Sequence, residues 1–248
     1  MSSHDRAART DKIRLVCATR LSADDFFASS ALGRSLQFYR TFPRGQPIEL
    51  RLFPNNSTSL STVYNQAIAE AAESPAVLVF VHDDVLLNDF YWARHLFEGL
   101  AHFDIIGLAG NRRRVAGQSS WMFLDDAFTR DDDANLSGVL GHGQGFPDLI
   151  ELSVYGQPGQ EVKLLDGVFI AARSSTLVKS GVRFDSRFEF HFYDLDFCRQ
   201  AELAGLRMGT WAISAIHASI GNFGRDIWRR SYVAYLAKYG ESLPCLRS

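Results

Sequence analysis

The chain has 248 residues, of which 46% are hydrophobic and 22% charged, and its formal net charge is -2. This composition is typical of a soluble globular protein with one substantial core, and the small charge gives no electrostatic reason to expect nucleic-acid binding. The three cysteines are widely separated, which suggests a reducing compartment, and no apolar run approaches the roughly 18 residues that span a bilayer. We therefore expect a cytoplasmic protein. Residues 1–12 are polar, unlike a signal peptide, and are expected to be flexible.

The first third of the chain alternates strands and helices. This pattern is typical of a parallel, Rossmann-like sheet. We expect strands at 13–18, 48–53 and 77–81 and helices at 23–39 and 60–73. Neither a GxGxxG motif nor a P-loop is present, so no dinucleotide or ATP cradle is indicated.

The third of these strands ends in a group of polar side chains. Five apolar residues at 77–81 are followed directly by His82, Asp83 and Asp84. Open α/β sheets bind ligands beyond the carboxyl ends of their strands. Two carboxylates and an imidazole at such an end suit a divalent cation such as Mg²⁺ or Mn²⁺. The alternative is that one aspartate only caps the next element.

The rest of the chain is less regular at first. After a helix at 92–101 and a strand at 104–109, residues 110–159 are rich in glycine, aspartate and asparagine and show little periodicity. A long irregular stretch of this kind is more often a functional loop region than a linker. Beyond it we expect strands at 162–172 and 208–216 and helices at 174–180, 194–204 and 226–238.

Three features of this second part receive plain structural interpretations. The run Asp131 to Asp133 has Asp-x-Asp spacing, but no apolar strand leads to it, so we expect a solvated loop. His142 lies between glycines and is expected to line the same loop. Trp228, Tyr232, Tyr235 and Tyr239 recur at helical spacing, which predicts a core-facing stripe, with peripheral membrane contact as a second interpretation.

Four segments, taken in order, resemble the GT-A glycosyltransferase fold and in particular its family 2-like group. They are Phe80 to Val85, Asp166 to Phe169, His191 to Asp196 and His217 to Ser219. The resemblance implies an α/β, Rossmann-like GT-A fold, with a central, mostly parallel sheet flanked by helices and an irregular, loop-rich insertion. It also implies a single domain over 13–248, in which 13–110 bind the nucleotide and 111–248 bind the sugar and the acceptor.

The resemblance also assigns roles to single residues. Asp84 and His217 are expected to hold Mn²⁺ or Mg²⁺, and Asp194 is expected to be the catalytic base, with a pKa lowered by the helix start. The alternatives are a locally hydrogen-bonded His217 and an Asp194 that only caps its helix. The residues expected to contact the donor are Thr19, Arg20, Asn55, Asn56, Asp83, Asp166 and Gly167. Arg112 to Arg114 are candidates for diphosphate contacts or a solvated basic loop, and Trp121 and Trp228 for sugar stacking or core packing.

The chain departs from the family pattern at two places. His82 stands where the family has its first acidic residue, and Asn55 and Asn56 replace an acidic pair that accepts the N3–H of uracil. An asparagine oxygen can still accept that hydrogen bond, so a UDP-sugar remains the preferred donor.

These expectations combine into one predicted function. It is an inverting, metal-dependent transfer of a sugar from a nucleotide-sugar donor to a hydroxyl of a glycan or lipid-linked acceptor. A non-catalytic domain that binds nucleotide sugars or glycans is the alternative. A nucleotidyltransferase is less favoured because residues 17–22, after the first strand, contain no glycine. The sequence does not indicate an oligomeric state.

Overall fold

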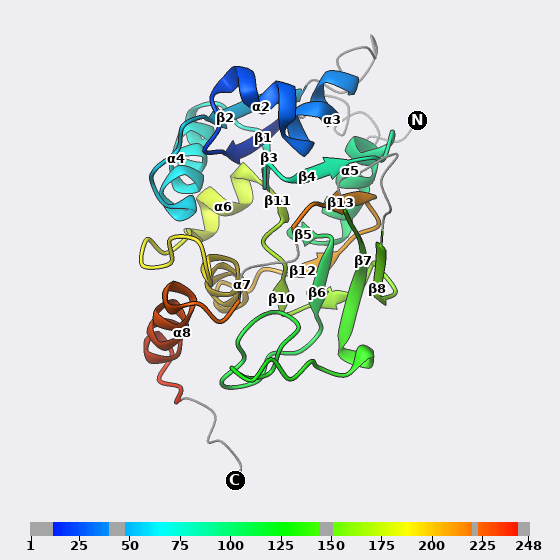
Figure 1. Cartoon of the computed structure of the whole chain (residues 1–248). Helices are drawn as coiled ribbons and strands as arrows, with labels where there is room; N and C mark the ends of the chain where they lie inside the picture. The colour runs from blue at the N-terminus through cyan, green and yellow to red at the C-terminus, as the bar shows by residue number, and fades with distance from the viewer. Residues whose placement is uncertain (1–11, 40–47, 144–150, 220–222, 243–248) are drawn as a thin grey trace.

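The computed structural model describes residues 12–39, 48–143, 151–219 and 223–242 (Figure 1). The expected flexible N-terminus, apart from its last residue, lies outside the described residues. The described chain forms two sheets with helices packed around them, which confirms the predicted α/β, Rossmann-like class.

The larger sheet has seven strands in the order β2-β1-β3-β11-β5-β12-β9. Five of them run in one direction, whereas β11 and β9 run in the opposite direction. Every residue of β3 is buried, as expected for a strand covered on both faces. The bounds are β1 Ile13–Ala18, β2 Ile48–Phe53, β3 Val77–Val81, β5 Ile105–Gly107, β9 Glu161–Val162, β11 Phe169–Arg173 and β12 Met208–Thr210.

The smaller sheet has the order β10-β6-β7-β13-β4, with β8 paired to β7. Its strands are β4 Val85–Leu87, β6 Ala109–Asn111, β7 Leu136–His142, β8 Glu151–Gly156, β10 Leu164–Leu165 and β13 Ala215–His217. The expectation of an irregular region at 110–159 therefore holds for 112–132 but not for β7 and β8. Glycine and serine within these two strands hide the alternation that would have indicated them.

Three single strands expected from the sequence are each divided between the two sheets. Residues 104–109 supply β5 to the larger sheet and begin β6 of the smaller one, and 208–216 supply β12 and β13 in the same way. Residues 162–172 contribute to β9, β10 and β11, which alternate between the sheets. These crossings join the two sheets.

The helices pack on both faces of the larger sheet (Figure 1). Side chains alternate along β3, so that Leu78 and Phe80 face the core beneath α4, α6, α7 and α8, whereas Val77, Val79 and Val81 face α2, α3 and α5. The bounds are α2 Ala23–Ser29, α3 Ala31–Tyr39, α4 Leu60–Glu73, α5 Trp92–His102, α6 Ser174–Ser180, α7 Tyr193–Leu203 and α8 Asp226–Lys238.

Two helix predictions can be compared in detail. The single helix expected at 23–39 is broken at Ser30, whose extended backbone lets its hydroxyl accept from the N–H of Gly33, so that it begins α3 like a cap. The core-facing stripe of α8 is confirmed: Trp228, Tyr232 and Tyr235 are buried in the core.

None of the helices in the described part of the chain has the length and apolar character needed to cross a membrane.

Candidate functional site

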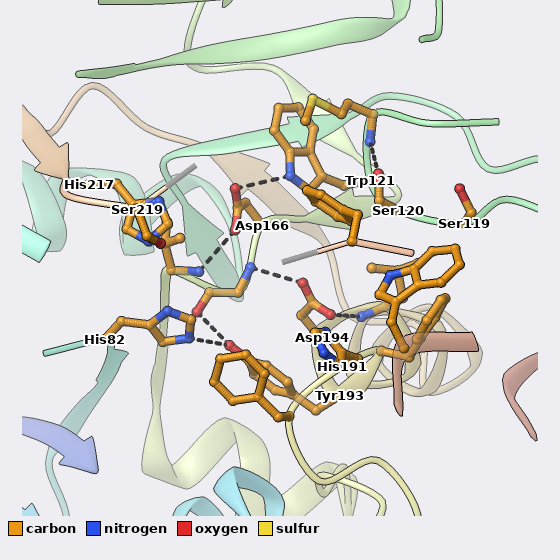
Figure 2. Close-up of a pocket in the computed structure, with 18 of the residues that line it drawn as sticks. His82, Ser119, Ser120, Trp121, Asp166, His191, Tyr193, Asp194, His217 and Ser219 are labelled. Atoms are coloured by element: carbon orange, nitrogen blue, oxygen red, sulfur yellow. Dashed lines mark hydrogen bonds between the residues drawn. The ribbon is translucent and has the colours of Figure 1, made fainter. Parts of the chain in front are cut away.

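A pocket of about 500 Å³ opens where the two sheets meet. Figure 2 shows 18 of the residues that line it. Five of the residues expected to act at the site line this pocket together: Asp84, Asp166, Gly167, Asp194 and His217. They come from segments far apart in the sequence, and the two-sheet arrangement brings them together.

The pairing of β4 with β13 places Asp84 beside His217. The N–H of Ala218 donates to the carbonyl of Asp84 at 2.9 Å, and His217 pairs with Val85 in the sheet. As a result, His217 Nε2 lies 3.3 Å from Asp84 Oδ2. His82, which the sequence left unassigned, joins them: one ligand atom from each of His82, Asp84 and His217 lies within 4.8 Å of the others.

The charges of this cluster fit a divalent cation. Asp84 Oδ1 is buried and has no hydrogen-bond partner among the described residues. Burial raises the pKa of Asp84, but the hydrogen bond and charge of His217 and the charge of His82 more than offset this and lower it to about 2. A buried carboxylate oxygen without a donor, between two imidazoles, is a set of atoms that suits a metal ion.

The base candidate Asp194 lies in the first turn of α7. Its Oδ2 accepts from the N–H of Gly167 at 3.1 Å, and its Oδ1 accepts from the N–H of Leu195 at 2.9 Å. The expected lowering of its pKa is wrong. Burial and the neighbouring Asp166 raise the pKa of Asp194 to about 7, against the opposing effect of the backbone hydrogen bonds. A carboxyl group with this pKa can exchange a proton near neutral pH.

Asp166 and Gly167 connect the parts of the site. Asp166 accepts from the indole N–H of Trp121 at 3.0 Å and from the N–H of Val168 at 3.1 Å. The carbonyl of Gly167 accepts from the hydroxyl of Tyr193 at 2.9 Å. A Cβ at Gly167 would collide with that hydroxyl, so the close approach requires glycine.

The other donor-contact candidates lie outside the lining of the pocket, at the carboxyl ends of β1, β2 and β3. Thr19 is buried, and its hydroxyl donates to Asp83 Oδ2 at 2.5 Å. The N–H of Asn56 donates to the carbonyl of Thr19 at 2.8 Å, which ties the ends of β1 and β2 together. Arg20 and Asn55 are exposed at this edge.

The side chain of Asn56 is occupied within its own turn. Its Oδ1 accepts from both the N–H and the hydroxyl of Thr58, and its Nδ2 donates to the carbonyl of Thr58. Both lone pairs of Oδ1 are therefore in use. Of the two asparagines, Asn55 is therefore the better candidate for the predicted hydrogen bond to a nucleobase.

Several expectations about the 110–159 region need correction. Asp131 is buried and bound by Arg113, Asn111 and Asn135, so it holds the loop together rather than being solvated. Two guanidinium nitrogens of Arg113, Nε and Nη2, donate to Asp131. Arg112 and Arg113 line a separate pocket.

Arg114 and His142 also differ from their expected settings. Arg114 pairs with Glu202 and Glu241. His142 ends β7 directly opposite His217 and lines the main pocket, instead of lying in a loop.

The sequence pointed to the imidazole of His82 as suited to a cation but did not assign it a role. It did not indicate that His142 and Tyr193 line this pocket.

Comparisons with known proteins were made against families, curated proteins and solved structures. The profile of a family described as a glycosyltransferase-like family matches residues 41–220. No curated protein matches the chain. Among solved structures, the chain is similar to the crystal structure of A197 from STIV, with a TM-score of 0.45 and 9% sequence identity over 86% of this chain and 97% of that chain.

Proposed function

Because the chain belongs to this glycosyltransferase-like family, we propose that it is an inverting, metal-dependent glycosyltransferase. The donor is a nucleotide sugar, with UDP-sugars favoured, and the acceptor is a hydroxyl group of a glycan or of a lipid-linked glycan. The observation that carries the proposal is that Asp84, His217 and Asp194 line the same pocket. This pocket therefore contains both a cluster of side chains suited to a cation and a carboxyl group of raised pKa.

The cation would be held by Asp84 and His217. When bound, it supplies Lewis-acid stabilisation of the negative charge on the departing diphosphate. The carboxyl ends of β1, β2 and β3 adjoin this cluster through Asp83 and Thr19, which supports placing the nucleotide there. Residues 13–110 then bind the nucleotide, and residues 111–248 supply most of the wall facing the sugar and the acceptor.

Asp194 is the base in this proposal. Its carboxylate removes the proton of the acceptor hydroxyl while the N–H of Gly167 holds one of its oxygens in place. A hydroxyl that attacks from the side of Asp194, opposite the nucleotide, gives an inverted anomeric centre. Positioned bases of this kind contribute about 10²- to 10⁴-fold in rate.

Aromatic side chains form much of the remaining wall. Trp121, Tyr155, Phe190 and Trp228 line the pocket, and Phe190 is exposed at its rim. Apolar ring faces beside polar groups suit the faces of sugar rings. A lipid-linked acceptor would bring the protein to a cytoplasmic membrane surface. The exposed Ile227 and Val233, with Arg229 and Arg230 on the same helix, support α8 as the contacting face.

The test is donor hydrolysis with Mn²⁺ and a panel of nucleotide sugars, measured for the wild type and for Asp194→Asn. We expect turnover in the wild type, a loss of about 10²-fold or more in the variant, and unchanged nucleotide binding. Asp24→Asn, which alters an exposed acid in the first turn of α2, is the matched control.

Two results would contradict the proposal. Nucleotide-sugar binding without turnover of any donor would indicate a non-catalytic binding domain. Consumption of nucleoside triphosphates with release of pyrophosphate would indicate a nucleotidyltransferase. The anomeric configuration of the product, determined by NMR, tests inversion separately.

A further inference from the structure

His82 lies in a hydrogen-bonded chain that fixes the position of its ring proton. Its Nε2 is 2.7 Å from the hydroxyl oxygen of Tyr193, and that hydroxyl donates to the carbonyl of Gly167 at 2.9 Å. A carbonyl oxygen can only accept, so the single proton of the tyrosine hydroxyl is directed to Gly167. The tyrosine oxygen must then accept from His82, which makes Nε2 the protonated nitrogen of the ring. Figure 2 shows the hydrogen bond between His82 and Tyr193.

The other nitrogen of His82 faces the carboxylate of Asp84. Nδ1 lies 4.0 Å from Asp84 Oδ1, which is too far for a hydrogen bond. With the ring proton on Nε2, both facing atoms carry lone pairs and neither carries a hydrogen. Asp84 Oδ1 is also the buried oxygen that has no partner among the described residues. An imidazole nitrogen and a buried carboxylate oxygen that face each other without a proton are stabilised by a cation.

We propose that His82 Nδ1 is a third protein ligand of the divalent cation held by Asp84 and His217. The inference rests on the proposed metal-dependent function and deepens it. It assigns a role to the residue that departs from the acidic pattern at this strand end.

The surroundings of His82 fit this role. Ligating histidines almost always donate their second ring N–H to a fixed partner, which sets the tautomer and the ring orientation. Tyr193, which is buried, provides that partner, and the ring of Phe190 stacks on the imidazole with 6.2 Å between centroids. Tyr193 is thus a positioning residue for the cation.

The hydrogen bonds that start at His82 also extend to Asp194, the proposed base. Gly167 accepts from Tyr193 through its carbonyl and donates to Asp194 through its N–H. One glycine peptide segment therefore sets both the orientation of a cation ligand and the position of the carboxylate.

Two imidazoles and one carboxylate also affect the choice of cation. Imidazole is a better ligand for transition metals than for Mg²⁺, so a second histidine shifts the preference further toward Mn²⁺.

The experiment is a titration of the metal-free full chain with Mn²⁺ alone, followed by electron paramagnetic resonance of free and bound Mn²⁺. We expect His82→Ala to weaken binding by about 100-fold and Tyr193→Phe by about 10-fold. His102→Ala, which removes an exposed histidine at the end of α5, outside the lining of this pocket, is expected to bind like the wild type. Nitrogen couplings of the bound Mn²⁺ should report two imidazoles in the wild type and one in His82→Ala.

The outcomes separate this inference from the function on which it rests. If Asp84→Asn abolishes Mn²⁺ binding while His82→Ala binds as tightly as the wild type with unchanged nitrogen couplings, the role of His82 is overturned and the metal site stands. If the wild type does not bind Mn²⁺, or if Asp84→Asn binds equally well, the proposed metal site and this inference both fail. Should His82→Ala not fold, Tyr193→Phe alone decides, because equal affinity in that variant contradicts the positioning of His82.

Discussion

Replacing Asp194 with asparagine is expected to raise the stability of the folded protein at alkaline pH. Burial and the neighbouring Asp166 raise the pKa of Asp194 to about 7 in the folded state. In the unfolded chain an aspartate titrates near 3.9. Between these values the folded state binds a proton that the unfolded state lacks, so the wild type loses stability as the pH rises toward 7. Asparagine does not titrate and avoids this loss.

The size of the effect follows from the two pKa values. One pKa unit corresponds to about 1.4 kcal/mol, so a shift of about three units limits the total effect to about 4 kcal/mol. About 1.5 kcal/mol of this is already present at pH 5, which leaves at most about 2.5 kcal/mol between pH 5 and pH 8. Because Asp194 is partly exposed, solvent screening reduces this figure. We expect the stability of Asp194→Asn relative to the wild type to increase by about 1 to 2 kcal/mol between pH 5 and pH 8.

The assay is urea denaturation of the wild type and Asp194→Asn at pH 5 and pH 8, with a chelator present to exclude metal ions. Comparing the two pH values cancels the loss of one backbone hydrogen bond, which asparagine causes at both. Asp24→Asn, at an exposed site, should change the free energy of unfolding by less than about 0.5 kcal/mol at either pH. A stability difference for Asp194→Asn that is constant with pH, or that falls at pH 8, would refute the reasoning.

Four further predictions follow from the site and the core. If Asp194 must be ionised to act, kcat/KM should rise about tenfold from pH 6 to pH 8 at saturating Mn²⁺, and a flat pH–rate profile would contradict its role as the base. Gly167→Ala should lower turnover and destabilise the fold by about 1 to 3 kcal/mol in thermal unfolding, because the added Cβ meets the Tyr193 hydroxyl. Asp196→Ala should lower the free energy of unfolding by about 3 to 5 kcal/mol in urea denaturation, because it removes a fully buried carboxylate and leaves Lys238 without that partner. Asp185→Ala, at a more exposed site, should lower it less. His82→Asp, which replaces one imidazole by a carboxylate, should reduce the preference for Mn²⁺ over Mg²⁺ in a competition titration, and an unchanged preference would count against His82 as a ligand.

The elements that the sequence predicts with the same bounds as the structure have local signals at their ends. Helix α4 starts after Ser59, whose hydroxyl accepts from the N–H of Thr62, and α6 ends at Ser180, directly before Gly181 in the left-handed region. Strands β1, β2 and β3 are short apolar or alternating runs, each followed by a polar residue or a proline. Such signals depend only on neighbouring residues and can be found without the fold.

The strands that cross between sheets lack any local signal. Leu108 separates β5 from β6, yet it is as apolar and as buried as its neighbours, so 104–109 looks like one strand. The division arises because β5 pairs with β11 and β12, whereas β6 pairs with β7 and β10. These partners come from distant parts of the chain, and the pattern of one segment does not reveal them.

The candidate site divides in the same way. The four segments that resemble the family indicated Asp84, Asp166, Asp194 and His217, and these do line one pocket. The raised pKa of Asp194 was missed because the helix start was weighed without burial and without Asp166, a residue from another segment. The bond between His82 and Tyr193 likewise depends on the packing of α7 against the end of β3.

The position of α8 has a consequence for how the protein is made. This helix brings Trp228 to the pocket wall, and near its end Lys238 pairs with Asp196 in α7, the helix whose first turn carries Asp194. During translation these partners leave the ribosome long after β1 to β3 have been synthesised. A growing chain can therefore assemble the carboxyl ends of β1 to β3 early, but the part of the pocket wall that α8 supplies is completed only once Lys238 has emerged.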